Sequence, residues 1–468
     1  MVRKAIFVLI IVSLPLYGED VAPIPEDVEQ TTTLLIEKGL QDDIGFNFVR
    51  DLTTEVGARL AGSESERQAR NWAVNRLETL GFADIRIEGF EIPFWSRLSD
   101  TAYIVSPNKQ NLVITSLGGS TSTPEGGIEA EVIRFNNIGE LQAAEVRDVR
   151  GKIVFIDEPM TRTQDGSGYS VAVRKRRTCA ADTVAKGGAA CLIRSVGTQQ
   201  RRFAHAGMMA RGKAIGDGAA AALSPPDAEQ LTRLLEKGPV RLYLDIEVET
   251  KSSAPSGNVI AEIRGRESPE EIVLIGCHLD SWDLGTGAVD NGAGCGVIVG
   301  AANLIKALPK APKRTIRLVL YGAEEVGLLG GREYAFRHAK ELDNHVLAAE
   351  SDFGADKIWR FETNFGEGAL SYARAIQQVL APLGIAPGDN NARGGPDISM
   401  LPQQGVPVVT PRQNGWDYFD LHHTADDTFD KIDQEKLNQN IAAYAAFTYL
   451  AAEMPWDFRK PAESSSEN

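Results

Sequence analysis

Residues 270–280, EEIVLIGCHLD, join a run of aliphatic residues to a histidine and an aspartate. A short apolar run bounded by polar residues is typical of a strand that is buried on both faces. His278 and Asp280 come where this strand ends, and open α/β sheets build their sites at the carboxyl ends of strands. The stretch therefore predicts a buried strand that delivers polar side chains to a site.

Strands and helices alternate around this stretch. Further strand-like runs and two helical patterns follow one another at 258–265, 293–308, 315–325, 345–354, 406–412 and 434–454. This alternation predicts an α/β fold with a mixed, mostly parallel sheet that helices cover on both faces. An earlier helix at 63–81 begins at a capping box, Ser63 with Glu66, and stops at Gly81.

The stretch between residues 96 and 253 has a different texture, with short strand-like runs separated by Gly and Pro turns. We expect an inserted, mostly β domain at 96–253. The α/β domain, which carries the candidate site, is then split into 19–95 and 254–458. The polar end, 459–468, predicts a disordered tail.

The N-terminus has the pattern of an export signal. Two basic residues precede an apolar run to about Leu16, and Gly18 precedes an acidic pair. We expect a signal peptide at 1–18 and a periplasmic or secreted protein that does not contact the membrane once the signal is removed. An uncleaved anchor is the alternative, because the residues before Glu19 match a cleavage site poorly.

The charge and the cysteines narrow the functional class. A net charge of −15 disfavours a nucleic-acid partner, which would be repelled. The four cysteines have no CxxC spacing, so they do not indicate a cysteine zinc site. A bridge between Cys179 and Cys191 is conceivable in an oxidising compartment, whereas Cys277 and Cys295 are expected to be packed thiols.

Histidines and carboxylates recur at the ends of the predicted strands and in the loops beyond them. These residues are His278, Asp290, Glu324, Glu325, Asp352 and His423. Any one of them alone would more often be a cap or a solvated charge, but together they form a donor set for divalent metal ions. The set is larger than one tetrahedral zinc needs, which favours two ions sharing a bridging carboxylate.

Neighbouring residues suggest supporting roles. Asp280 lies two residues beyond His278, on the same side of an extended chain, where it can accept the second imidazole N–H. Of the adjacent pair Glu324 and Glu325, one can bind metal while the other acts as a base toward water.

Other interpretations are weaker. The GAGCG stretch lacks the GxGxxG spacing of a dinucleotide loop, and the GxSxG motif of a nucleophile elbow is absent. His422 is expected to neighbour a ligand rather than be one. His205 is expected to have a surface or packing role, and His338 and His345 to face solvent.

An ordered series of motifs identifies a family. The motifs are GARLAGSE, GKIVFIDEP, AACLIRSVG with HAGMM, CHLDSWDLGTGAVDNGAG, LYGAEEVGLLG, ESDFG, GGPDIS and HHTADDT. In this order they resemble the co-catalytic zinc aminopeptidases, a zinc exopeptidase family, and most closely its carboxypeptidase Q branch. The resemblance implies an inserted protease-associated-like domain, a possible homodimer and a non-proline cis peptide at residues 290–291.

The resemblance also implies residue roles. It implies two Zn²⁺ ions per chain, with five ligands: His278 and Asp352 on one ion, Glu325 and His423 on the other, and Asp290 between them. It implies that Glu324 is the general base and that Asp280 supports His278.

Candidates for substrate contact come from loops. Asp397 stands in a loop that the family places near the substrate. Tyr418 is a plausible wall of the pocket, together with Trp282, Trp416 and Phe419.

The expected function is a zinc-dependent exopeptidase, an aminopeptidase or dipeptidase. It would activate water at two zinc ions and cleave after the first residue of dipeptides or short unblocked peptides. One alternative is a glutaminyl cyclase of the same fold, which uses one zinc. Another is a receptor-like binding protein without turnover.

Overall fold

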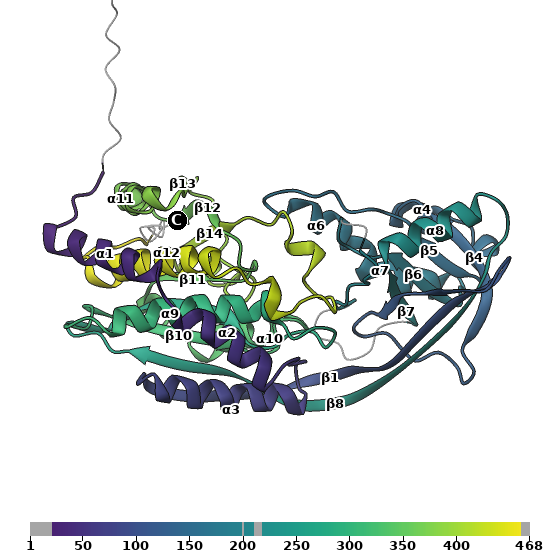
Figure 1. Ribbon diagram of the computed structural model, residues 1–468, viewed down its shortest axis with the longest axis horizontal. Helices are drawn as coiled ribbons and strands as arrows, with labels where there is room; N and C mark the ends of the chain where they lie inside the picture. The colour runs from purple at the N-terminus through teal and green to yellow at the C-terminus, as the bar shows by residue number, and fades with distance from the viewer. Residues whose placement is uncertain (1–20, 199–200, 210–217, 460–468) are drawn as a thin grey trace, which may run out of the picture.

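The computed structural model describes residues 21–198, 201–209 and 218–459. The signal peptide expected at 1–18 lies outside these residues, as does the expected tail apart from Arg459. The described chain forms two lobes that are joined by a pair of long strands (Figure 1).

The strands of both lobes belong to one continuous hydrogen-bonded sheet. Their bounds are β1 Ala83–Ser106, β2 Gln110–Leu112, β3 Ile114–Ser116, β4 Ile128–Phe135, β5 Ile153–Ile156, β6 Ala190–Arg194, β7 Ala220–Leu223, β8 Arg241–Ile263, β9 Ser268–His278, β10 Arg314–Tyr321, β11 His345–Glu350, β12 Ile358–Asn364, β13 Ala386–Pro387 and β14 Val408–Gln413.

Helices flank this sheet in both lobes. Their bounds are α1 Glu26–Gly39, α2 Ile44–Glu55, α3 Glu64–Thr79, α4 Ile138–Ala143, α5 Val146–Val149, α6 Ser167–Ala172, α7 Arg174–Ala185, α8 Pro225–Leu235, α9 Ala293–Lys306, α10 Leu329–Arg337, α11 Leu370–Leu380 and α12 Gln434–Glu453.

The main lobe is built on strands in the order β1-β8-β10-β9-β11-β14-β12-β13. The central strands β10, β9, β11 and β14 run parallel, while β8 and β12 join them antiparallel. This mixed, mostly parallel sheet confirms the predicted fold class. Parallel central strands put the ends of β9, β10 and β11 at one edge of the sheet.

Alternate residues of the central strands enter two separate cores. Val273 and Ile275 of β9 pack in the core that contains α9 and α12, whereas Ile272 and Leu274 pack toward α10 on the other face. A strand buried on both faces must be apolar throughout, which explains the continuous aliphatic run that predicted β9.

Helix α9 is a core element. The stretch Ala288–Lys306 is long and apolar enough to span a membrane, but most of it is buried inside the fold. It packs between β9 and α12. Burial on all sides explains its apolar composition.

Helix α3 begins and ends where the sequence predicted. The Ser63 hydroxyl accepts the N–H of Glu66, and Gly81 follows the helix with a φ of 77°. The Glu66 carboxylate accepts the N–H of Gly62 instead of closing the capping box on Ser63. This carboxylate is buried, and it also pairs with Arg70 and accepts the hydroxyl of Ser256. These partners compensate for the loss of solvent.

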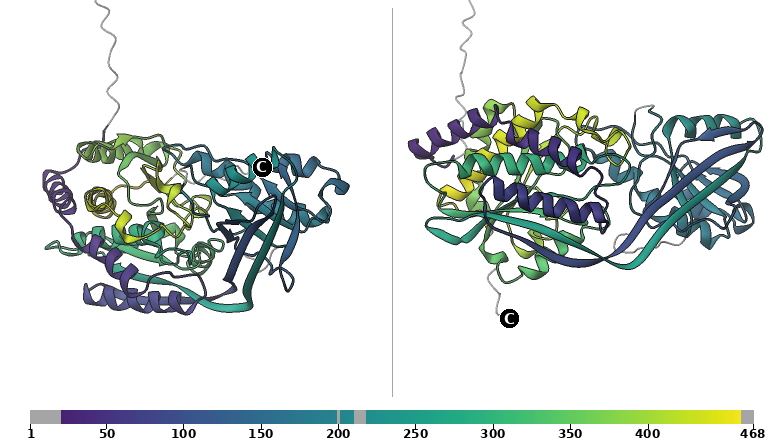
Figure 2. Two further views of the ribbon diagram at one scale, coloured as in Figure 1. Left: turned by 45° about the vertical axis from the view of Figure 1, so that its right-hand side comes forward. Right: turned by 60° about the horizontal axis from the view of Figure 1, so that its bottom comes forward.

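Strands β1 and β8 form an antiparallel ribbon that runs from the main lobe into the second lobe (Figure 2). The expected domain boundaries at residues 96 and 253 both fall inside this ribbon. Pro93 sits at a register shift between Ile92 and Phe94, and β1 continues beyond it. Irregular pairing is where a strand tolerates proline.

The second lobe contains more helix than its sequence texture indicated. Strands β4, β5, β6 and β7 run parallel, and β3 pairs antiparallel with β7 at the edge. Helices α4, α5, α6, α7 and α8 all lie in this lobe, where we expected a mostly β domain.

The cysteines are paired in two bridges. Cys179 of α7 bonds to Cys191 of β6, the pairing that the sequence left open. Cys277 bonds to Cys295, so the expectation of two packed thiols was wrong. The end of β9 and the first turn of α9 lie side by side, with 5.2 Å between the Cα atoms, and sequence spacing does not reveal this proximity.

His338 and His345 are buried, so the expectation that they face solvent was wrong. His345 opens β11, where its Nδ1–H donates to the Glu341 carbonyl and its Nε2 accepts the Tyr334 hydroxyl. His338 stacks on the ring of Tyr334. Both imidazoles therefore serve the packing of α10 against the sheet.

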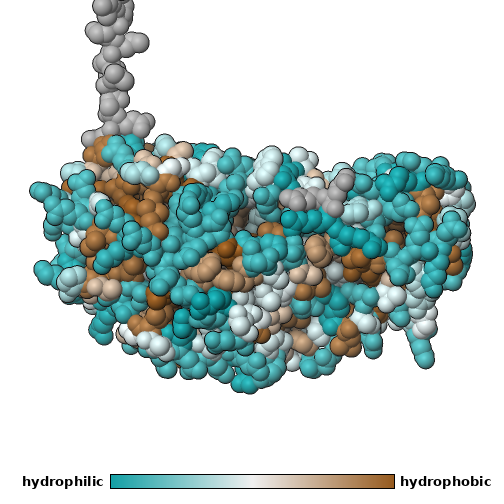
Figure 3. Space-filling view, in the orientation of Figure 1, coloured by the Kyte–Doolittle hydropathy of each residue, from teal (hydrophilic) through white to brown (hydrophobic). Residues whose placement is uncertain are grey.

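The surface agrees with the acidic composition. Figure 3 shows a largely hydrophilic face, with hydrophobic residues gathered at the end of the main lobe near α1. Leu34 of α1 and the adjacent Leu40 are 42% and 44% exposed.

Candidate metal centre

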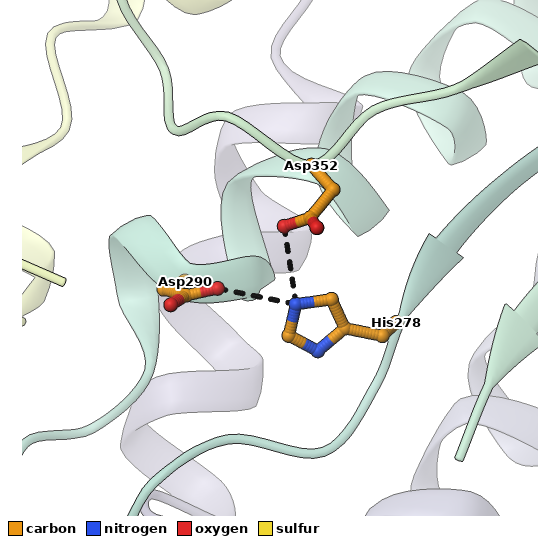
Figure 4. A group of neighbouring side chains, drawn as sticks. All are labelled: His278, Asp290 and Asp352. Carbon is orange, nitrogen blue, oxygen red and sulfur yellow. Dashed lines mark hydrogen bonds and ion pairs between the residues drawn. The ribbon is translucent and has the colours of Figure 1, made fainter. Parts of the chain in front are cut away.

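One cluster of possible ligands forms where β9 ends. Figure 4 shows the His278 imidazole between two carboxylates, with Nε2 directed at both. Nε2 lies 3.1 Å from Asp290 Oδ1 and 3.2 Å from Asp352 Oδ1. The three side chains come from the end of β9, the turn before α9 and the loop after β11.

A second cluster contains the other oxygen of Asp290. His423 Nε2 lies 3.1 Å from Asp290 Oδ2 and 2.9 Å from Glu325 Oε2. Asp290 therefore lies between the two imidazoles and presents one carboxylate oxygen to each. The structure brings together all five residues named by the resemblance, in the two groups that it implied.

The donor atoms fit a metal site. Within each cluster the imidazole nitrogen and the carboxylate oxygens lie within 4.8 Å of one another. Oε1 of Glu325 is buried without a hydrogen-bond partner among the described residues. Imidazole nitrogens with carboxylate oxygens are donors that zinc accepts.

The pKa values of the two imidazoles indicate that the centre attracts positive charge. Burial alone would lower the pKa of His278, but Asp352, Asp280 and Asp290 raise it well above its usual value. For His423, Glu325 and Asp290 likewise outweigh burial and raise the pKa. The carboxylates thus draw protons onto both imidazoles, and a bound metal ion would replace those protons.

Asp280 links two strand ends. Nδ1 of His278 donates to the backbone carbonyl of Asp280 at 3.0 Å, while the nearest carboxylate oxygen is 3.7 Å away. The carboxylate accepts the N–H groups of Glu324 and Glu325 at 3.1 and 3.3 Å. It therefore holds the chain that carries both glutamates beside the end of β9.

The second lobe holds His423 in place. Nδ1 of His423 donates to the carbonyl of Ala206 at 3.2 Å, and the Ala206 N–H donates back to the His423 carbonyl at 2.9 Å. This contact leaves Nε2 of His423 facing Asp290 and Glu325. Ala206 lies in the motif HAGMM, whose pattern alone indicates no role for it.

Two further residues, Asp427 and Arg59, shape the turn around Asp290, and the sequence motifs did not single them out. The Asp427 carboxylate accepts the N–H groups of Val289 and Asp290, at 2.6 and 3.2 Å. Burial, reinforced by the nearby Asp290, raises the pKa of Asp427 to about 7. The peptide bond after Asp290 is cis, as the resemblance implied.

Arg59 ties the loop between β9 and Asp290 together from inside the protein. Its fully buried guanidinium donates to the carbonyls of Leu279, Thr286 and Gly287, at 2.7 to 2.9 Å. Both residues stood within quoted motifs, Arg59 in GARLAGSE and Asp427 in HHTADDT, but pattern alone did not reveal their partners.

A cavity of about 250 Å³ opens onto the two clusters. Glu324 lines it beside Asp290, Glu325 and Asp352. Burial, followed by the neighbouring carboxylates, raises the pKa of Glu324 well above its usual value. Glu324 is therefore the carboxylate that faces the cavity without belonging to either cluster.

The predicted substrate contacts differ in position. Tyr418 and Phe419 line the cavity. Asp397 is buried and accepts the Gly331 N–H, and its neighbour Pro396 lines the cavity in its place. Trp282 and Trp416 are not among the lining residues.

His422 lines the cavity, and His205 packs against His422. The ring of His422 stacks on that of His423 with centroids 4.1 Å apart, so it neighbours the cluster as expected. His205 is buried, and its Nε2 donates to the Phe419 carbonyl.

Several known proteins are similar to this chain in sequence and in fold. A model of "Peptidase family M28" matches residues 258–448. Carboxypeptidase Q from Mus musculus is 32% identical, over 92% of this chain and 90% of that protein. The crystal structure of a peptidase M28 precursor from Shewanella amazonensis is 44% identical with a TM-score of 0.90, over 92% of this chain and 98% of that one.

A more distant likeness supports the fold. A zinc aminopeptidase from Bacillus subtilis, 20% identical, has a TM-score of 0.64 over 89% of this chain and 97% of that one. The resemblance drawn from the motifs is confirmed by the carboxypeptidase Q match over nearly the whole chain. The chain belongs to peptidase family M28.

Proposed function

We propose that this M28 peptidase is an aminopeptidase or dipeptidase that removes the first residue of dipeptides or short unblocked peptides at a centre of two zinc ions. Membership of the family makes the chain a metallo-exopeptidase. The number of ions, the residue roles and the substrate are the proposed part.

The observation that carries the proposal is the position of Asp290. Its two carboxylate oxygens face different imidazoles, His278 and His423. A single zinc ion would need only one of these clusters. The pairing of both around one carboxylate therefore supports two ions with Asp290 between them, and it favours a peptidase over the one-zinc glutaminyl cyclase.

Each residue then has a defined task. We assign His278 and Asp352 to one ion, Glu325 and His423 to the other, and Asp290 to both. When bound, zinc supplies a Lewis acid that polarises the scissile carbonyl and makes a water molecule more acidic. Glu324, which faces the cavity outside both clusters, accepts a proton from water and passes it to the leaving amine.

The cavity favours a free substrate amine. Four carboxylates line it, at Asp290, Glu324, Glu325 and Asp352. Bound zinc would neutralise the three carboxylates of the clusters, but Glu324 can still pair with an α-ammonium group, and an unprotonated α-amine can bind zinc. An acetylated amine is neutral and does neither. This contrast supports unblocked N-termini as the substrates.

The test is a comparison of unblocked dipeptides with their N-acetylated forms on zinc-loaded protein. We expect release of free amino acids from the unblocked dipeptides only, with loss of activity on chelation and recovery at about two zinc ions per chain. Release of ammonia from an N-terminal glutamine peptide instead would support the cyclase. A zinc-loaded protein that cleaves neither kind of substrate would support a receptor-like role.

We also propose that the protein is exported. The N-terminal sequence has the pattern of a signal peptide, and both disulfides of the described chain need an oxidising compartment to persist. N-terminal sequencing of protein from the periplasm or the medium would test this by finding a start near Glu19.

A further inference from the structure

A buried arginine from the second lobe lines the same cavity as the metal centre. Arg176 lies in the first turn of α7, and only 8% of its surface is exposed. Its exposed neighbour Arg177 also lines the cavity, so Arg176 is the buried one of two arginines in a cavity that four carboxylates line as well.

The Arg176 guanidinium has N–H donors that are not used in hydrogen bonds. It carries five N–H groups. Nη2 donates to the Tyr169 hydroxyl at 3.2 Å, and Nη1 donates to the Ala206 carbonyl at 3.4 Å. Nε is buried with no partner, and Arg176 forms no ion pair with any carboxylate in the part of the chain that the structure describes. A buried arginine without a carboxylate has donors that an anionic ligand can satisfy.

The backbone leaves room for this arginine. Gly207 has a φ of 138°, and a Cβ atom at this position would overlap the Arg176 guanidinium. The glycine therefore allows the planar group to lie against the chain beside Ala206. The Arg176 side chain is therefore closely packed against the backbone and is not a mobile surface group.

Its distance from the metal centre suits a short substrate. The same Ala206 oxygen accepts from Arg176 and from His423, so one carbonyl separates the guanidinium from the imidazole of the second cluster. In a dipeptide, the terminal carboxylate lies one residue beyond the scissile carbonyl, a spacing of about 3.8 Å between Cα atoms. A carboxylate at Arg176 is then compatible with a scissile bond at the metal centre.

We propose that Arg176 binds the C-terminal carboxylate of dipeptide substrates and so makes the enzyme select dipeptides over longer peptides. This inference rests on the proposed exopeptidase function. A longer peptide places an uncharged amide where a dipeptide has its carboxylate, and it loses the paired hydrogen bonds that arginine forms with a carboxylate.

The experiment compares an unblocked dipeptide with its C-terminal amide, using the zinc-loaded wild type and Arg176→Met. We expect the wild type to prefer the free acid by about 10- to 100-fold in kcat/KM, the worth of a charged hydrogen bond. The substitution should remove this preference by slowing hydrolysis of the acid, with little change for the amide. Arg176→Lys should restore part of it.

Arg174→Met is the matched control. Arg174 is exposed on the same helix and is not among the residues that line the cavity, so its loss removes the same charge without touching the site. We expect the control to keep the wild-type preference. An equal loss of preference in the control would show a general charge effect and overturn the proposal.

Binding gives a readout that does not depend on turnover. A dipeptide analogue with a reduced, uncleavable bond and a free carboxylate should bind metal-free Arg176→Met about 10-fold more weakly than metal-free wild type by calorimetry. Equal binding would overturn the proposal, as would a wild type that cleaves acid and amide alike. A wild type that cleaves neither refutes the exopeptidase function itself, and the inference falls with it.

Discussion

Two adjacent glutamates face different surroundings at the centre. Glu325 Oε2 lies 2.9 Å from Nε2 of His423, within a cluster, whereas Glu324 faces the cavity. Both backbone N–H groups are held by the Asp280 carboxylate. The two side chains are therefore directed apart by one fixed turn, and substitutions at them should have different consequences.

Replacing Glu324 with glutamine should lower kcat by about 10²- to 10⁴-fold, because the amide cannot accept a proton from water. The zinc content should stay at the wild-type level. Kinetics and metal analysis on the same preparations provide the measurement.

Glu325→Gln is the matched control for this prediction. It removes the same charge one residue away, but from a cluster, so the protein should lose zinc together with activity. If Glu324→Gln loses as much zinc as Glu325→Gln, Glu324 is a ligand and not the base.

Sequence patterns identified the residues that carry the chemistry and not the ones that hold them. His278, Asp352 and the glutamates stand at the ends of apolar runs, where strand pattern alone indicates a site. Ala206 contributes only a backbone carbonyl, and any residue type could supply that. Its contact with His423 spans 217 residues of sequence, so no local pattern could predict it.

The loop that follows β9 depends on Arg59 for its shape. Replacing Arg59 with methionine leaves buried carbonyls without donors, and each such loss costs about 1–3 kcal/mol. We predict that the free energy of unfolding falls by about 3 kcal/mol or more and that zinc affinity falls with it. Denaturant titration and zinc competition would measure both.

Arg67→Met serves as the control for the Arg59 substitution. Arg67 is exposed on α3, and among the residues that the structure describes it forms an ion pair only with Glu64 on the same helix. Its replacement should leave both quantities near the wild-type values. Equal effects from the two substitutions would argue against a specific role of Arg59 in the loop.

The contact between α10 and β11 should make stability depend on pH. Burial, aided by nearby Arg317, lowers the pKa of His345 to about 4 from 6.5. The folded-state pKa is depressed, so this contribution is fully present above pH 6.5 and is lost as pH falls toward 4. Between these values it amounts to about 1.4 kcal/mol per pH unit at most.

Urea unfolding of His345→Gln across the same range measures this contribution. Glutamine does not titrate, so the variant should show a shallower fall in unfolding free energy than the wild type between pH 6.5 and 4. From pH 7 to 8 the two proteins should have the same slope. An identical slope at acidic pH would mean that His345 is protonated in the folded state.

The two lobes have to meet for the cavity to exist. Tyr169, Arg176 and Met208 come from the second lobe, and the metal cluster comes from the main lobe. The alternation of helices and strands predicted the main sheet, because its strands are buried on both faces. The joining ribbon was missed, because β1 and β8 are long strands whose pairing partner lies over a hundred residues away.

The most direct test of the two-ion centre is anomalous diffraction at the zinc edge from crystals grown with zinc. The account predicts two peaks per chain, with one oxygen of Asp290 on each, His278 on the first ion and His423 on the second. A single peak, or an Asp290 carboxylate that touches only one ion when zinc is in excess, would contradict it.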